Sequence, residues 1–250
     1  MSGTVYLVGA GPGASDLLTV RAVRLLSEAD VVFHDALVHP DTLALAARAE
    51  KIPVGKRCGK HSTAQRFINK RLADAARGHK VVVRLKGGDP MLFGRAHEEL
   101  SYLRAQGVRV EVVPGVTAAA AASAEIGISL TRRGAARTVA FVTPRVGRGE
   151  RESTWIACVL AADTAAIYMG AGEAEAIAAA LIRAGKPAST PVALVEDASL
   201  PGMSAQYATL GELPRLATRG APTLILLGEV YREALLEAAL FQRLRASQRL

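Results

Sequence analysis

The 250-residue sequence is poor in aromatic side chains, and it contains no long apolar run. Only 4% of the residues are aromatic although half are hydrophobic, so alanine, valine and leucine supply the core. Nucleic-acid modules often combine basic residues with stacking aromatics, and the scarcity of aromatics argues against such a partner. No stretch approaches the roughly 18 consecutive apolar residues of a membrane-spanning helix, so we expect no membrane partner either.

Cysteine is also rare. Cys58 and Cys158 lie far apart and lack metal-site spacing, which indicates reduced thiols in a reducing compartment. The start, MSGTVYLVGAG, has no basic segment and only a four-residue apolar run before its glycines, so we expect no signal peptide. His34 and His39 lack a third metal ligand, so no metal is expected. We therefore predict a cytoplasmic, metal-free protein.

Positive charge is plentiful. The chain has 31 Lys and Arg against 23 Asp and Glu, a formal net charge of +8, which favours an anionic partner. The arginines are spread along the chain rather than clustered, and the charge alone does not identify the anion.

The C-terminal stretch YREALLEAALFQRLRASQRL is an amphipathic basic helix, which we interpret as a solvent-exposed surface helix.

Strand and helix patterns alternate through the first half of the chain. Thr19 is placed to cap a helix whose apolar positions Val20, Val23 and Leu26 repeat at helical spacing. Strands are expected at 4–8, 31–34, 51–54, 81–83 and 108–113, and further helices at 40–49, 63–77, 96–106 and 116–124. This alternation predicts an α/β fold.

The second half has a different rhythm. Glycines and arginines surround a single strand at 138–143, and we place a domain boundary at residue 133. Further strands are expected at 165–169, 191–195, 206–209 and 223–227, with a helix at 173–183. The shorter connections predict a mixed sheet. The sequence thus predicts two α/β domains, 1–133 and 134–250.

The first glycine loop, GAGPGASDLLT, partly matches a dinucleotide-binding fingerprint. Gly9, Gly11 and Ala14 follow a strand with the spacing G-x-G-x-x-A, and Asp35 ends the next strand, where a ribose-binding acid would lie. Against this interpretation, the helical pattern begins only near Thr19 rather than within the glycines. An NAD-dependent dehydrogenase and a purely structural turn both stay open at this point.

A second glycine loop follows the apolar run 81–83, in RLKGGDPMLFGR. Glycine and proline are the usual residues of tight turns, which accounts for the composition without a ligand. The alternative is that exposed backbone amides and the carboxylate of Asp89 are presented to a small molecule. Composition does not decide between the two.

Several stretches taken together resemble a known family. They are VGAGPG followed by DLLT, then DALV, VGKR, RLKGGDPMLFGR with two glutamates after it, VVPGVTAA, YMG and PTLILLGEV. In this order they are similar to uroporphyrinogen-III C-methyltransferases of the tetrapyrrole methylase family, over about 5–230. The resemblance implies two α/β domains with the active site in the cleft between them, usually in a homodimer.

The resemblance also implies a cofactor, S-adenosyl-L-methionine, which leaves as S-adenosyl-L-homocysteine. Residues at matching positions are expected to contact it: Pro12, Gly87, Gly88, Asp89, Leu92, Thr117, Ala118, Met169 and Ala198, with 221–223 lining the same pocket. Glycine permits close approach of the backbone, and a carboxylate accepts hydrogen bonds from hydroxyl or amino groups. Without the family pattern, Thr117 and the alanines would be interpreted as helix packing and Met169 as core.

The implied reaction is two methylations of uroporphyrinogen III, at C2 and C7, giving precorrin-2 for sirohaem or cobalamin. By resemblance, Asp35 is the proton acceptor and Lys56 the proton donor; otherwise they would be a polar strand end and a surface charge. Arginines suit the eight carboxylates of this substrate. The candidates are Arg57, Arg84, Arg95, Arg132 and Arg133.

Some positions depart from the family pattern. Ala14 replaces an aspartate and His34 a tyrosine, and Ser129 and Arg132 replace a proline and a histidine, while Pro144 and Arg145 replace a glycine and a histidine. None of them is an expected cofactor contact. They lie where the tetrapyrrole is expected, so a later precorrin methyltransferase stays open as the nearest alternative, and a non-catalytic anion-binding module as the most distant.

Overall fold

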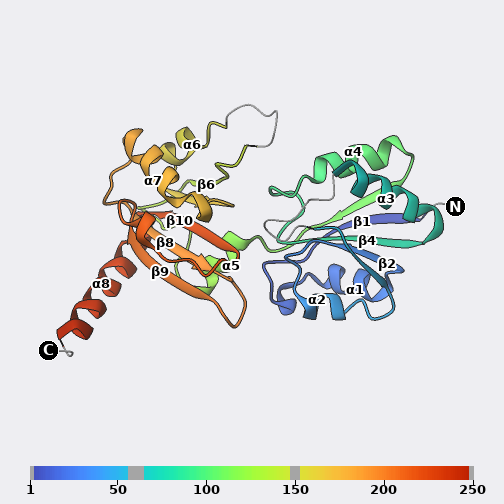
Figure 1. Ribbon diagram of the computed structural model, residues 1–250, viewed down its shortest axis with the longest axis horizontal. Coiled ribbons are helices and arrows are strands. Elements are labelled where there is room, and N and C mark those ends of the chain that lie inside the picture. Colours follow the sequence, from blue (N-terminus) through green and yellow to red (C-terminus); the bar gives the residue numbers. More distant parts are fainter. Residues whose placement is uncertain (1–2, 56–64, 147–152, 248–250) are drawn as a thin grey trace. The chain divides into compact units, whose positions relative to one another are not determined.

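The computed structural model describes residues 3–55, 65–146 and 153–247. The chain divides into two compact units, Met1–Ala118 and Ala119–Leu250, each built on a five-stranded sheet (Figure 1). The α/β class is confirmed. The division comes earlier than the predicted boundary at residue 133, because the alanine-rich helix α5 (Ala118–Glu125) packs with the second unit, where the Ala119 amide donates to the Tyr168 hydroxyl at 3.1 Å.

The first unit alternates strands and helices, as predicted. Its elements are β1 (Thr4–Gly9), η1 (Ser15–Leu17), α1 (Val20–Glu28), β2 (Val31–His34), α2 (Pro40–Ala44), β3 (Glu50–Pro53), α3 (Gln65–Gly78), β4 (Val81–Lys86), α4 (Ala96–Ala105) and β5 (Arg109–Val113). The Thr19 hydroxyl caps α1 by accepting from the Ala22 amide at 3.2 Å, as expected. Helix α2 is shorter than the predicted 40–49.

The first sheet is wholly parallel, in the order β3-β2-β4-β1-β5. Helices cover both faces, α1 and α2 on one and α3 and α4 on the other (Figure 1). The central strands are therefore buried on both sides, which explains their nearly continuous valine and leucine runs. All five strands end at the same edge, so the loops that follow them are neighbours.

The second unit contains β6 (Val139–Val142), α6 (Trp155–Ala161), β7 (Thr164–Ile167), η2 (Ala171–Glu173), α7 (Ala174–Arg183), β8 (Pro191–Glu196), β9 (Ser204–Thr209), η3 (Leu213–Arg215), β10 (Thr223–Gly228), η4 (Glu229–Tyr231) and α8 (Arg232–Ser247). The sheet order is β6-β7-β10-β8-β9. Strands β6 and β7 are parallel and the other pairs antiparallel, so the sheet is mixed, as expected. Helix α6 was not predicted. In the described part of the chain, no helix is long and apolar enough to span a membrane.

Candidate active site

The loops at the carboxyl edge of the first sheet hold most of the residues singled out from the sequence. Asp35 follows β2, Pro12 lies after β1, the GGD loop follows β4, and Thr117 and Ala118 lie after β5. In an open parallel sheet this edge is where ligands bind. The fold thus brings together residues from four separate stretches of the sequence.

Three of these loops touch through their backbones. The Gly88 amide donates to the Gly11 carbonyl at 2.7 Å, and the Gly11 amide donates back to the Gly88 carbonyl at 3.2 Å. A Cβ on Gly9 would lie 2.6 Å from the amide nitrogen of Gly115, and one on Gly115 would lie 2.4 Å from the Gly88 carbonyl oxygen. Side chains are excluded from these contacts, so the glycines are required by close backbone approach as well as by turning.

Two of these glycines also need their backbone angles. Gly11 has φ +68° and Gly88 has φ +66°, values that other residues rarely adopt. The stretch RLKGGDPMLFGR therefore does form a turn that requires glycine, which the turn interpretation predicted. Among the described residues, no heavy atom other than those of its chain neighbours lies within 4 Å of the position a Gly88 Cβ would take, so the space beside this loop is open. Both features suit a bare backbone that a ligand approaches.

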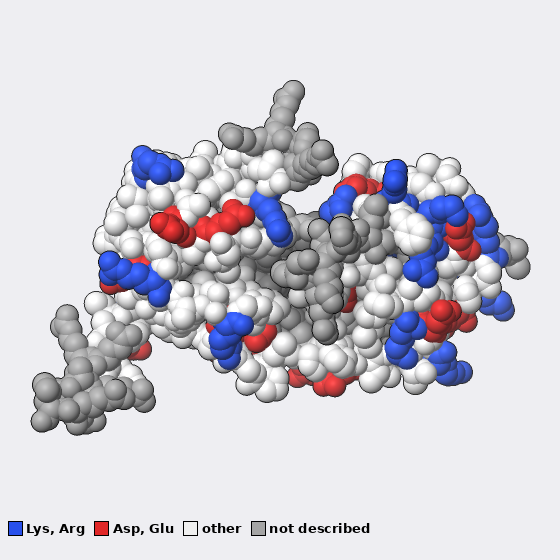
Figure 2. All heavy atoms as spheres, viewed as in Figure 1, with Lys and Arg blue, Asp and Glu red and all other residues white. Residues whose placement is uncertain are grey.

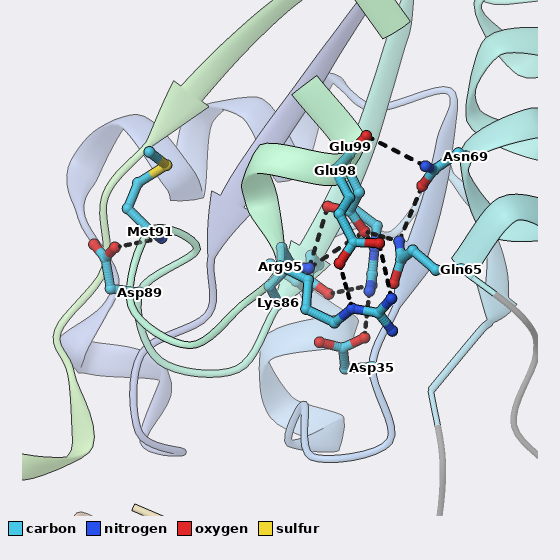
Figure 3. Close-up of polar contacts among 11 residues, drawn as sticks. Asp35, Gln65, Asn69, Lys86, Asp89, Met91, Arg95, Glu98 and Glu99 are labelled. Carbon is cyan, nitrogen blue, oxygen red and sulfur yellow. Dashed lines mark hydrogen bonds and ion pairs between the residues drawn. The ribbon is translucent and has the colours of Figure 1, made fainter. Parts of the chain in front are cut away.

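Asp89 holds its loop in shape. One carboxylate oxygen accepts from the Met91 amide at 2.7 Å (Figure 3). The other accepts from the Gly115 amide at 2.9 Å, which ties the loop after β4 to the loop after β5. Leu92, beyond it, donates its amide to the Asp89 carbonyl at 3.3 Å. Each carboxylate oxygen retains acceptor capacity for a ligand, because a carboxylate offers about four lone-pair sites.

Asp35 lies beside a buried arginine. Its Oδ1, labelled with Asp35 in Figure 3, accepts a 2.5 Å hydrogen bond from Nη2 of Arg84. The Asp35 side chain remains 29% exposed. The neighbouring His34 ring contacts the Asp35 carbonyl at 3.1 Å. Asp35 is therefore both anchored and open to solvent, which is what a carboxylate that meets a substrate requires.

The sequence did not reveal that Arg84 is buried. Its side chain is only 3% exposed and its Nε donates to Glu99 at 3.1 Å, so Arg84 is not the solvated surface arginine that would be expected by default, and its contact with the substrate stays a prediction. Burial opposes its charge, but the carboxylates of Asp35 and Glu99 outweigh this and raise the pKa of Arg84. A buried parallel strand normally carries apolar residues here, and nothing in the local pattern signals an inward arginine.

The other predicted arginines differ in setting. Arg95 is half exposed and pairs with Glu98 at 2.7 Å, while Arg132 pairs with Glu233 of α8 at 3.1 Å and Arg133 is exposed. Lys56 and Arg57 lie outside the described residues. Basic and acidic side chains are interspersed over the face in Figure 2 rather than gathered into one patch.

The second unit also gathers its predicted residues at one sheet edge. Met169 follows β7, Ala198 follows β8, and 221–223 leads into β10, which runs antiparallel to both strands. The Asp197 amide donates to the Pro222 carbonyl at 2.9 Å. Met169 is 45% exposed with φ +58°, so it is not a core residue.

Ala198 lies in a strained turn. It is buried, and its neighbours Asp197 and Ser199 have φ of +50° and +73°, which costs free energy for residues other than glycine. Arg219 holds this turn from outside: its Nη2 donates to the Gly202 carbonyl at 2.8 Å, and its Nε to Glu196 at 3.3 Å. No sequence feature indicated this contact.

Removing the Arg219 side chain is expected to loosen the turn. Glu196 is 1% exposed and would lose one of its donors, so we expect Arg219→Ala to cost about 1–2 kcal/mol and to lower the Tm by about 2–8 °C. Affinity for S-adenosylhomocysteine, measured by calorimetry, should fall severalfold if Ala198 contacts the cofactor. The control is Arg215→Ala, an exposed arginine of η3, which should change neither quantity. If the Arg219→Ala variant is destabilised but its affinity for S-adenosylhomocysteine is unchanged, Ala198 does not contact the cofactor.

The described residues contain no group of three or more His, Cys, Asp or Glu side chains that could hold a metal ion.

The first glycine loop does not have the geometry of a dinucleotide-binding fingerprint. The fingerprint requires a helix that starts within the glycines, whereas α1 begins at Val20 after the short η1. The glycines serve close loop contacts instead.

The two sheets, with glycine loops at the carboxyl edge of the first, define a two-unit α/β protein with a small-molecule site. The family model of tetrapyrrole (corrin/porphyrin) methylases matches residues 4–214. The chain belongs to this family, and the family prediction from the sequence is confirmed.

Individual relatives agree. The siroheme synthase of Pseudomonas fluorescens (strain Pf0-1) is 46% identical over 233 residues, which cover 92% of this chain and 50% of that protein. The siroheme synthase of Azotobacter vinelandii is 47% identical with the same coverage. The chain thus spans about half the length of the curated relatives it matches.

Solved structures match over nearly their whole length. A uroporphyrin-III C-methyl transferase from Thermus thermophilus, complexed with S-adenyl homocysteine, is 44% identical with a TM-score of 0.82, covering 92% of this chain and 99% of that one. A cobalt precorrin-4 methyltransferase is 30% identical with a TM-score of 0.79, covering 91% and 95%.

Proposed function

We propose that the protein is an S-adenosylmethionine-dependent uroporphyrinogen-III C-methyltransferase, which adds two methyl groups to give precorrin-2. The observation that carries the proposal is the 44% identity to the Thermus enzyme over 92% of this chain, with the glycine loops in place. The 30% identity to a precorrin-4 methyltransferase is lower, which favours uroporphyrinogen III over a later precorrin.

The residues of the first edge fit the cofactor. When bound, S-adenosylmethionine supplies a methyl group on a positively charged sulfonium, so the transfer needs no metal. Bare backbone at Gly87 and Gly88, with open space beside Gly88, accommodates a ligand at close range, and Asp89 keeps its loop rigid. Pro12, Leu92, Thr117 and Ala118 are half-buried around this loop system, and Met169 and Ala198 are the proposed contacts from the second unit.

Asp35 and Lys56 handle protons in this proposal. A methylated ring of the reduced macrocycle carries a positive charge until it loses a proton, and Asp35 is the group that accepts it. The half-open setting of its carboxylate beside Arg84 supports this role. Lys56 is proposed as the proton donor on the family pattern alone.

A direct assay tests the function. Uroporphyrinogen III, generated under anaerobic conditions, is incubated with the protein and S-adenosylmethionine, and the products are weighed by mass spectrometry. We expect two added methyl groups and two S-adenosylhomocysteines per ring. Calorimetry with S-adenosylhomocysteine, NAD and a short oligonucleotide is run in parallel. Affinity for NAD alone would point to a dehydrogenase, and salt-dependent oligonucleotide binding without the cofactor to an anion-binding module.

We further propose that the chain works as a cytoplasmic homodimer. The thiol of Cys158 is free and exposed, as expected in a reducing compartment. Leu236 and Leu240 repeat at helical spacing on α8 and are 61% and 59% exposed, and Phe241 of the same helix, 57% exposed, lines a groove together with Ile126 and Ile128. A second copy of the chain would cover this apolar surface.

We expect Leu240→Glu to convert the dimer to a monomer, because a buried unpaired carboxylate is costly. Light scattering after size-exclusion chromatography measures the mass. Val20→Glu on α1 serves as the control, since Val20 is 88% exposed and lies in the first unit, away from α8 in the sequence. A Leu240→Glu dimer of unchanged stability would place the interface elsewhere.

A further inference from the structure

A fully buried glutamate lies behind the proposed base. Glu99, in the first turn of α4, is 0% exposed, and its carboxylate faces two cations on β4 (Figure 3). Its Oε1 accepts from Arg84 Nε at 3.1 Å, and Lys86 Nζ lies 3.1 Å from its Oε2. Arg84 and Lys86 are two apart in the strand, so their side chains leave the same face of the sheet.

Neutral side chains complete the cluster from α3. The Gln65 amide donates to Glu99 at 3.0 Å and to Asn69 at 2.9 Å, and the Asn69 amide donates to the Glu98 carbonyl at 3.3 Å. These contacts fix the position of the glutamate from a third element. Arg84 links this cluster to the partly exposed carboxylate of Asp35.

Stability alone does not account for such a cluster. Replacing a buried ion pair by apolar side chains of similar volume is often neutral or stabilising, because desolvation offsets much of the attraction. Burial and the nearby Arg84 guanidinium already lower the pKa of Lys86, despite the two carboxylates beside it. A strand buried on both faces would satisfy the fold with valine and leucine at both positions.

We propose that Glu99 is a positioning residue, which through Arg84 holds the Asp35 carboxylate in place for its proton transfer. The Arg84 guanidinium bridges the two carboxylates, because its Nε donates to Glu99 and its Nη2 donates to Asp35. The contact with Glu99 therefore fixes the orientation of the guanidinium plane that Asp35 meets. A planar fork held at both ends loses little freedom, and a guanidinium does not release its proton. The inference rests on the proposed role of Asp35.

Glu99 also balances charge. The groups that face Asp35 from the described elements are Arg84 and Lys86 on β4 and Glu99 on α4, with His34 adjacent in the chain and the Arg95–Glu98 pair at the start of α4. Asp35, Glu99, Arg84 and Lys86 together carry no net charge. Removing the charge of Glu99 leaves an excess of positive charge, which favours ionised Asp35 and makes it a weaker base.

Glu99→Gln tests the proposal, since it keeps the volume and removes the charge. We expect kcat to fall at least about tenfold while KM for the tetrapyrrole and the affinity for S-adenosylhomocysteine stay within about twofold. The acidic limb of the kcat profile should move to lower pH. If the role of Glu99 is purely structural, the variant will have a lower Tm, and the acidic limb of its kcat profile will stay at the wild-type pH. The matched control is Glu111→Gln, which removes the charge of a glutamate that forms an exposed ion pair with Arg109 on β5.

A second variant separates position from charge. Glu99→Leu with Lys86→Met restores the charge balance of the cluster but removes the second anchor of Arg84, because leucine has no oxygen to accept from its Nε. We expect the acidic limb to return toward that of the wild type while kcat stays low. If both variants bind S-adenosylhomocysteine and keep kcat within twofold, or if neither folds, Glu99 is structural and the proposal is overturned.

The proposed role of Asp35 is tested separately by Asp35→Asn. If this variant keeps a near-normal rate, that role fails and Glu99 has nothing to position. If Asp35→Asn is inactive while Glu99→Gln keeps the wild-type rate and pH profile, only the inference about Glu99 fails.

Discussion

We expect Asp35→Asn to lower the methylation rate constant by about 10²- to 10⁴-fold, the usual contribution of a general base. Asparagine retains an oxygen that can accept from Arg84, so the local geometry is largely kept, but its amide cannot take up a proton. The rate is measured in single turnover, with enzyme in excess over uroporphyrinogen III. Affinity for S-adenosylhomocysteine, measured by calorimetry, should be unchanged within about twofold.

The same variant removes a partner of a buried arginine, so stability must be measured beside the rate. Arg84 is 3% exposed and keeps Glu99 as its partner, and we expect a lower Tm in a chain that remains folded. The matched control is Asp74→Asn on α3, which removes a surface carboxylate paired with Lys70 and Arg77. The control should keep both rate and Tm, because exposed ion pairs contribute little. A rate within twofold of the wild type in folded, cofactor-binding Asp35→Asn would exclude the proposed role.

The second large effect is expected at Gly9. A Cβ there would lie 2.6 Å from the Gly115 amide nitrogen and 2.8 Å from the Gly88 carbonyl oxygen, and neither neighbour is a movable side chain. Gly9→Ala therefore has to push the loops after β1, β4 and β5 apart. We expect a loss of about 1–3 kcal/mol in stability and at least about a tenfold loss of affinity for S-adenosylhomocysteine.

Gly78→Ala is the control for this substitution. Gly78 ends α3 in the same unit, and in the described part of the chain no heavy atom beyond its own helix backbone and neighbours lies within 4 Å of the position its Cβ would take. Alanine is favoured over glycine in a helix, so stability should be unchanged or higher and affinity unchanged. Wild-type cofactor affinity in Gly9→Ala would mean that the contact among these loops does not shape the cofactor site.

Much of the fold could be predicted because its patterns are local. Hydrophobic runs bounded by glycine, proline and polar residues predicted the strands that form, and Thr19 predicted the start of α1. The cofactor candidates of the first unit, such as Gly88, and Asp35 do lie at one edge, since all the strands there are parallel, whereas Lys56 lies outside the described residues. Helix α6 was missed, and the alanines of α5 carry no sign in the sequence of which sheet they pack against.

The sequence by itself determined the class of fold, the family and the glycine loops, since each of these depends on short segments whose spacing can be followed along the chain. Only the tertiary structure decided that Arg84 points inward, that Asp89 joins two loops and that Glu99 lies behind Asp35. The physical reason is that a charged side chain is expected to be exposed to solvent when only its neighbours in the sequence are known. Its burial becomes tolerable only when a distant segment brings an opposite charge, as α4 and the loop after β2 do for Arg84.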